Sequence, residues 1–97
     1  VVAPAVINAI SAAIGKPLTV LLGTADTDRN DPDLRKTPEA DAQGLTRFAR
    51  GQAFHSRGKA AASELGTPFG WTLVTVPGIG HSNAGMANAA AELIAAP

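Results

Sequence analysis

The chain of 97 residues contains no cysteine and no tyrosine, and its aromatic side chains are limited to Phe48, Phe54, Phe69 and Trp71. Without cysteine the chain can form neither a disulfide, nor a thiolate nucleophile, nor a cysteine-based zinc site. The absence fits a reducing compartment and slightly favours a cytoplasmic location. So few aromatic rings also leave few platforms on which the bases of a single-stranded nucleic acid could stack.

The chain also lacks an excess of either charge, since eight lysines and arginines balance eight aspartates and glutamates. No long-range field therefore favours a nucleic acid or an anionic membrane as a partner. The uncharged stretch from Val1 to Gly15 is shorter than the roughly 20 apolar residues that a membrane span needs. A signal peptide begins with basic residues, whereas Lys16 follows this stretch. We interpret the stretch as a buried helix, and we predict no membrane span, no cofactor and no metal ion.

Apolar patterning and turn residues predict helices and strands in alternation. The longer helices are expected at 5–14, 45–65 and 84–95, and the strands at about 18–22 and 70–76. Gly15 and Gly66 suit the ends of the first two helices. Thr37 suits the N-cap of a short helical turn that Gly44 interrupts.

Gly44, Gly51 and Gly58 recur at intervals of seven residues in the region of the long helix. Each interior glycine costs a helix about 0.5–1 kcal/mol relative to alanine. The spacing predicts a close approach of this helix to a sheet or to a neighbouring helix. A bias in coding composition explains the same glycines equally well.

The run from Leu18 to Leu22 is almost continuously apolar, which is typical of a strand buried on both faces of a parallel sheet. Strand, crossover helix and strand form a βαβ unit, so the two strands are expected to be parallel. Independent sheets need three or more strands. We therefore expect the chain to be part of something larger, completed either by the rest of one domain or by a second copy of the chain.

Two candidate catalytic side chains follow the two strands. Asp26 lies in Gly23-Thr24-Ala25-Asp26-Thr27-Asp28, and His81 lies in Val76-Pro77-Gly78-Ile79-Gly80-His81-Ser82-Asn83. Since neighbouring parallel strands place their C-terminal loops on one rim, the two side chains are expected to meet. A carboxylate that accepts a hydrogen bond from imidazole Nδ1, at about 2.6–3.2 Å, orients the ring and leaves Nε2 as a general base.

These loops resemble the C-terminal part of an α/β-hydrolase. Gly23-Thr24-Ala25-Asp26 is similar to the G-x-x-D turn that carries the acid of that family, and Gly80-His81 is similar to the loop that presents its histidine. The amino-acid sequences of both loops are similar to those of bacterial hydrolases related to polyhydroxybutyrate depolymerases. The resemblance implies that residues 1–97 are the C-terminal βαβα portion of a single α/β-hydrolase domain. It also implies a serine hydrolase that acts on a small-molecule ester, with Asp26 and His81 as the acid and base of its triad.

The nucleophile of that family lies in a G-x-S-x-G turn, and no such pentapeptide occurs in the chain. We expect the nucleophile N-terminal to residue 1, in a remainder of the hydrolase that is the partner of this chain. The 97-residue chain by itself is then expected to be inactive. The same acid and histidine also occur in hydrolases with an aspartate nucleophile, so the identity of the nucleophile stays open.

Ser82 is a rival nucleophile, because the segment from Gly80 to Gly85 comes within one residue of the motif. Two features count against it. No histidine follows Ser82, whereas the histidine comes last in the family order. The stretch from Pro77 to Gly80 also separates Ser82 from the end of its strand.

The acidic loop leaves further alternatives open. Asp28 is the second candidate for the acid, because it lies within one turn of Asp26. Asp26, Asp28 and Asn30 match the first three ligand positions of an EF-hand loop, but Asp31 replaces the turn glycine. The loop also suits a non-enzymatic α/β module that binds a cation or a protein partner.

The remaining candidates are assigned structural roles. Arg29, Arg35 and Lys36 are expected to neutralise the acidic loop. His55 is expected at the surface of the long helix.

Overall fold

The computed structural model describes residues 4–95 and contains four helices and two strands within them. In chain order these are α1 (Pro4–Gly15), β1 (Thr19–Gly23), α2 (Pro38–Asp41), α3 (Arg47–Leu65), β2 (Thr72–Val76) and α4 (Asn83–Ala95). The strands pair in parallel, from Thr19 opposite Thr72 to Gly23 opposite Val76. The predicted α/β class and the predicted parallel, neighbouring strands are confirmed.

Local chemistry sets where the two crossover helices begin and end. Thr37 and Thr46 each accept a hydrogen bond from the backbone N–H three residues further on, at 3.1 and 3.2 Å. Gly44 has a φ of 141°, which places it in the turn between α2 and α3 and outside the long helix. Gly66 ends α3 in the left-handed conformation that glycine adopts without strain.

β2 begins two residues later than predicted, because the segment before it packs against the end of α1. The N–H of Gly70 donates to the carbonyl oxygen of Ile14 at 2.9 Å, and Nε1 of Trp71 donates to that of Ala13 at 3.1 Å. Both donors point to α1, so regular pairing with β1 starts only at Thr72.

At two of the three glycines that recur every seven residues, α3 approaches β1 and the residue before β2 closely. A Cβ atom at Gly51 would overlap the side chain of Leu22, and a Cβ atom at Gly58 would overlap the ring of Trp71. Trp71 also stacks on Phe54 of α3, with ring centroids 4.9 Å apart. The predicted close approach is confirmed at these two positions.

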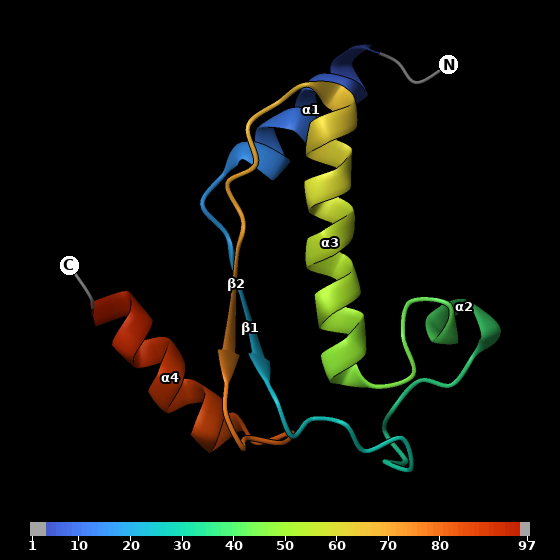
Figure 1. Ribbon diagram of the computed structural model, residues 1–97, viewed down its shortest axis with the longest axis vertical. Helices are drawn as coiled ribbons and strands as arrows, with labels where there is room; N and C mark the ends of the chain where they lie inside the picture. Colours follow the sequence, from blue (N-terminus) through green and yellow to red (C-terminus); the bar gives the residue numbers. More distant parts are fainter. Residues whose placement is uncertain (1–3, 96–97) are drawn as a thin grey trace.

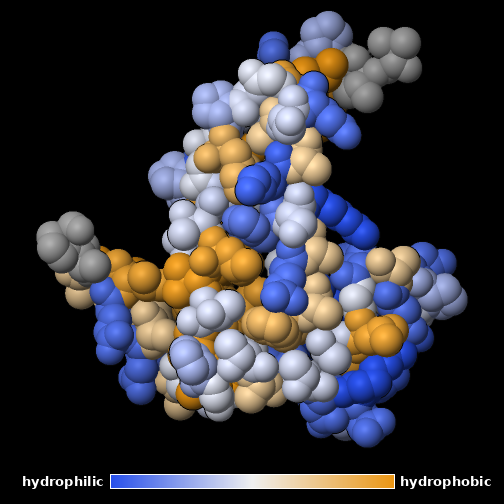
Figure 2. Space-filling model, viewed as in Figure 1, coloured by the Kyte–Doolittle hydropathy of each residue, from blue (hydrophilic) through white to orange (hydrophobic). Residues whose placement is uncertain are grey.

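Many large apolar side chains of this chain are exposed to solvent. The buried apolar residues among those described are Ile14, Leu34 and Ala62. Within this chain α1 packs on α3 and leaves Val6 and Ile10 48% and 42% exposed, so the predicted burial of the N-terminal helix stays a prediction that requires the rest of the domain or a second copy. Figure 1 shows α3 and α4 on opposite sides of the strands, and Figure 2 shows apolar residues gathered over the sheet and the adjoining part of α4.

This apolar surface is hollowed between β1 and α4. A groove of about 220 Å³ is lined by Thr19, Leu21, Ala90, Leu93 and Ile94. Ile94 is 85% exposed, although such side chains are most often buried in folded domains.

Within residues 4–95, every helix is too short or too polar to cross a membrane.

Candidate functional site

The loops that follow β1 and β2 lie side by side and are joined by backbone hydrogen bonds. The N–H of Thr24 donates to the carbonyl oxygen of Val76, and the N–H of Ala25 donates to that of Ile79, both at 3.0 Å. At Gly23 an added Cβ atom would overlap the carbonyl of Ile79, so only glycine allows this approach. The two loops therefore stay in contact beyond the last paired residues of the strands, Gly23 and Val76.

This pairing brings Asp26 and His81 together. Oδ2 of Asp26 lies 3.5 Å from Nδ1 of His81, and their side chains are 18% and 61% exposed. The distance is longer than the predicted hydrogen bond of about 2.6–3.2 Å. The approach of a carboxylate to Nδ1 is the predicted arrangement, and it leaves Nε2 on the other side of the ring.

Arg47 also contacts Asp26, and the sequence analysis did not single it out. Its Nη1 atom lies 3.8 Å from Oδ1 of Asp26 and 2.7 Å from Oδ2 of Asp31. The hydrogen bond from Arg47 holds the pKa of Asp31 below its usual value, and the same bond raises the pKa of Arg47. Arg47 is the first residue of α3, directly after the N-cap Thr46, but no local pattern in the sequence indicates which carboxylate it contacts.

Asp28, the second candidate for the acid, contacts its own loop. Its Oδ1 accepts a hydrogen bond from the N–H of Asn30 at 2.9 Å. Oδ1 of Asp31 makes the same kind of contact with the N–H of Asp33. Of the aspartates in the acidic loop, Asp26 is the one in ion-pair contact with His81.

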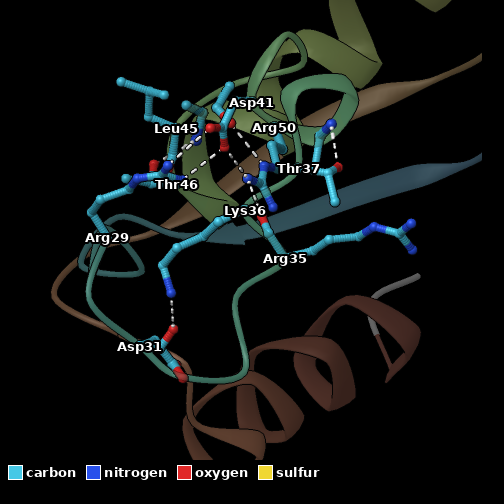
Figure 3. A network of polar contacts seen from close by, with 12 residues as sticks. Arg29, Asp31, Arg35, Lys36, Thr37, Asp41, Leu45, Thr46 and Arg50 are labelled. Carbon is cyan, nitrogen blue, oxygen red and sulfur yellow. Dashed lines mark hydrogen bonds and ion pairs between the residues drawn. The ribbon is translucent and has the colours of Figure 1, made fainter.

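The prediction that Arg29, Arg35 and Lys36 neutralise the acidic loop is wrong, because none of them forms an ion pair with a carboxylate of that loop within the described residues. Arg29 donates to both carboxylate oxygens of Asp41, at 2.8 and 2.9 Å, and Arg50 contacts the same carboxylate at 3.2 Å (Figure 3). Lys36 donates to the backbone carbonyl oxygen of Asp31 rather than to a carboxylate. The hydrogen bonds from Arg29 hold the pKa of Asp41 below its usual value.

The EF-hand alternative has no support in this geometry. Within the described residues, no group of three histidine, aspartate or glutamate side chains is arranged to hold a metal ion. Asp28 and Asp31 instead accept hydrogen bonds from the backbone of their own loop, and Asp31 accepts a further one from Arg47.

Ser82 and His55 lie outside the contact between Asp26 and His81. Oγ of Ser82 accepts a hydrogen bond from the N–H of Gly85 at 3.2 Å, so Ser82 caps α4. His55 is half-buried rather than freely exposed, because its ring packs edge-on against Phe69 with centroids 5.2 Å apart.

The fold, together with the contact between the loops that follow β1 and β2, indicates a class of protein. Paired parallel strands with helices on both sides bring an acid and a histidine to their C-terminal ends, which is the arrangement of an α/β-hydrolase. No family model and no curated protein matches the chain.

Two solved structures, both of α/β-hydrolases, are similar to it. A poly(aspartic acid) hydrolase from Sphingomonas sp. KT-1 is 48% identical, with a TM-score of 0.90, over 95% of this chain. LpqC, a poly(3-hydroxybutyrate) depolymerase from Bordetella parapertussis, is 38% identical, with a TM-score of 0.83, over 88% of this chain. The match covers 35% of the first protein and 28% of the second. The predicted resemblance to depolymerase-like hydrolases is confirmed, and the chain is consistent with the C-terminal part of such a hydrolase.

Proposed function

We propose that this chain supplies the acid and the base of the catalytic triad of a hydrolase, with Asp26 as the acid and His81 as the base. The observation that carries the proposal is the 3.5 Å approach of Oδ2 of Asp26 to Nδ1 of His81 at the rim of the parallel strands. Its support from relatives is the similarity to two hydrolases that act on polymers.

The proposed chemistry follows from the side of the imidazole that Asp26 approaches. A carboxylate at Nδ1 fixes the tautomer that carries its proton there, which leaves Nε2 free to accept a proton from the nucleophile. After acylation the same nitrogen activates water for release of the acyl group. Asp26 stabilises the imidazolium that forms in each step and stays ionised.

We propose that the nucleophile and the oxyanion hole belong to an N-terminal remainder of the same α/β-hydrolase domain. The chain has no G-x-S-x-G segment, and Ser82 is engaged as a helix cap. The same remainder would cover the exposed apolar faces of the strands and helices, which a second copy of the chain could also cover. Residues 1–97 alone would then hold a base with no nucleophile to activate.

For the substrate we propose an ester of a small carboxylic acid, by similarity to the poly(3-hydroxybutyrate) depolymerase. The other relative acts on poly(aspartic acid), whose links are amides. Both bonds are cleaved through an acyl-enzyme, but an alcohol leaves more readily than an amine. We therefore expect hydrolysis of esters to be faster than hydrolysis of amides.

The test uses the complete hydrolase that contains this chain. A fluorophosphonate probe should label one serine outside residues 1–97, and peptide mapping should locate it. His81→Ala should fold and should lower ester hydrolysis by about 10,000-fold or more. Labelling of Ser82, or unchanged hydrolysis in His81→Ala, would refute the proposed triad.

The bond class is tested by comparing 4-nitrophenyl butyrate and oligomers of 3-hydroxybutyrate with poly(aspartic acid). The expected result is a higher kcat/KM for the two esters. A preference for poly(aspartic acid) would refute the ester assignment while leaving the triad intact. No hydrolysis of any of them, with no serine labelled, would favour the non-enzymatic module.

A further inference from the structure

We propose that Arg47 is a positioning residue that holds the carboxylate of Asp26 in place against His81. The inference rests on the proposed function, because it assigns a role to Arg47 in orienting the acid of that triad. It goes further in identifying a residue on a crossover helix, distant from both catalytic loops in the sequence, as part of the site.

The carboxylate of Asp26 lies between two cationic or potentially cationic groups. Oδ2 faces Nδ1 of His81 at 3.5 Å, while Oδ1 faces Nη1 of Arg47 at 3.8 Å. Each oxygen therefore has its own neighbour. Rotation of the carboxylate away from His81 would also take Oδ1 away from the guanidinium.

Arg47 is itself held in place. Its Nη1 atom donates a 2.7 Å hydrogen bond to Oδ2 of Asp31, and 22% of its side chain is exposed. A guanidinium fixed by one carboxylate loses less side-chain entropy when it attracts a second one. Arg47 can therefore act on Asp26 as a fixed charge.

The backbone of Asp26 is attached to the same helix turn. Its carbonyl oxygen accepts a hydrogen bond from the N–H of Phe48 at 3.0 Å, one of the first N–H groups of α3. Both the main chain and the side chain of the acid thus contact the first turn of α3. A site supported by a regular helix is more precisely placed than one supported by loops alone.

Loss of Arg47 would leave two carboxylates near one another without the cation between them. Asp26 and Asp31 would repel, and Asp26 would lose the contact to Oδ1. The predicted effect is a less well oriented histidine, which lowers the rate of the chemical step without changing the contacts that bind substrate.

Arg50 provides a matched control on the same helix. It is similarly shielded, with 18% of its side chain exposed, and it contacts Asp41 and the carbonyl oxygens of Arg35 and Gly44 (Figure 3). Arg50 makes no ion-pair contact with Asp26 within the described residues. Its loss removes structural hydrogen bonds from the same region without touching the acid.

The experiment measures kcat, KM and thermal stability for Arg47→Met, Arg47→Lys and Arg50→Met in the complete hydrolase. Arg47→Met should lower kcat by about 10- to 100-fold with KM within about twofold of wild type. Arg47→Lys should recover part of that loss, because the ammonium keeps the charge. Arg50→Met should lower the melting temperature by at least as much as Arg47→Met, with kcat close to wild type.

A kcat of Arg47→Met within about twofold of wild type overturns the proposal, as does an equal loss in Arg50→Met or no recovery in Arg47→Lys. If Arg47→Met does not fold, Asp31→Asn replaces it, because it keeps the cation and removes its anchor. A lower kcat with unchanged KM in Asp31→Asn supports the proposal, and an unchanged kcat overturns it. Full activity in His81→Ala would refute the triad itself, whereas loss of activity there with full activity in Arg47→Met refutes only the role of Arg47.

Discussion

Asp26 and His81 are 55 positions apart in the sequence, yet Oδ2 of the first lies 3.5 Å from Nδ1 of the second. The contact depends on the parallel register of β1 and β2, which aligns Gly23 with Val76 at the end of the ladder. The loops then continue side by side for several residues. A change that alters this loop pairing should therefore alter activity without touching either side chain.

Gly23 is the position at which the loop pairing is most sensitive to substitution. A Cβ atom there would overlap the backbone carbonyl of Ile79, which cannot move without displacing the loop that carries His81. At Gly80 the nearest atom to an added Cβ is the carbonyl oxygen of Ala25 at 3.6 Å, an ordinary contact. We predict that Gly23→Ala lowers kcat of the complete hydrolase far more than Gly80→Ala does. Equal effects in a steady-state assay would show that the loop pairing does not control the site.

The packing of α3 on the sheet leads to a second prediction. Alanine at Gly58 places its methyl group in the rigid ring of Trp71, whereas alanine at Gly51 meets the flexible end of the Leu22 side chain. We expect Gly58→Ala to lower the free energy of unfolding by about 1–3 kcal/mol, because overpacking outweighs the gain in helix propensity. Gly51→Ala should cost less. Denaturant unfolding of both variants measures the difference, and a more stable Gly58→Ala would contradict the predicted overlap.

Acid should weaken the arginine–aspartate pairs around the acidic loop. Hydrogen bonds from Arg47 and Arg29 hold the pKa values of Asp31 and Asp41 below the ordinary value of 3.8. A group whose pKa is lower in the folded state contributes stability that is complete above its unfolded pKa and is lost as the pH falls through the folded pKa. The free energy of unfolding should therefore drop below about pH 4.

Urea titrations of the complete protein between about pH 7 and about pH 3 measure this drop. The double variant Asp31→Asn, Asp41→Asn should show a smaller drop than wild type, because asparagine does not titrate. An equal drop in both proteins would mean that other carboxyls account for the acid sensitivity.

The order of the elements and the two loops could be predicted from the sequence because both depend on local patterns. The apolar run of β1 and the glycines that follow both strands are read directly from neighbouring residues. Parallel pairing then follows from the crossover helix, and the meeting of Asp26 with His81 follows from parallel pairing.

The role of Arg47 could not be predicted in this way. Its distance to Asp26 depends on the path of the acidic loop, where backbone turns and ion pairs replace periodic patterning. How much of α1 this chain covers could not be predicted either, because composition shows that a helix is apolar but not which part of its surface the rest of the same chain contacts. The late start of β2 has the same kind of cause, since it depends on the tertiary contact of Trp71 with α1.

The most direct test of the account compares Asp26→Asn with Asp28→Asn in the complete hydrolase, with kcat for an ester substrate as the measurement. The amide introduced by Asp28→Asn keeps an oxygen that can accept from the N–H of Asn30, so this variant should retain nearly full kcat. Asp26→Asn removes the charge that orients His81 and should lower kcat by roughly 10,000-fold. Full activity in Asp26→Asn, or the larger loss in Asp28→Asn, would contradict the assignment of Asp26 as the acid.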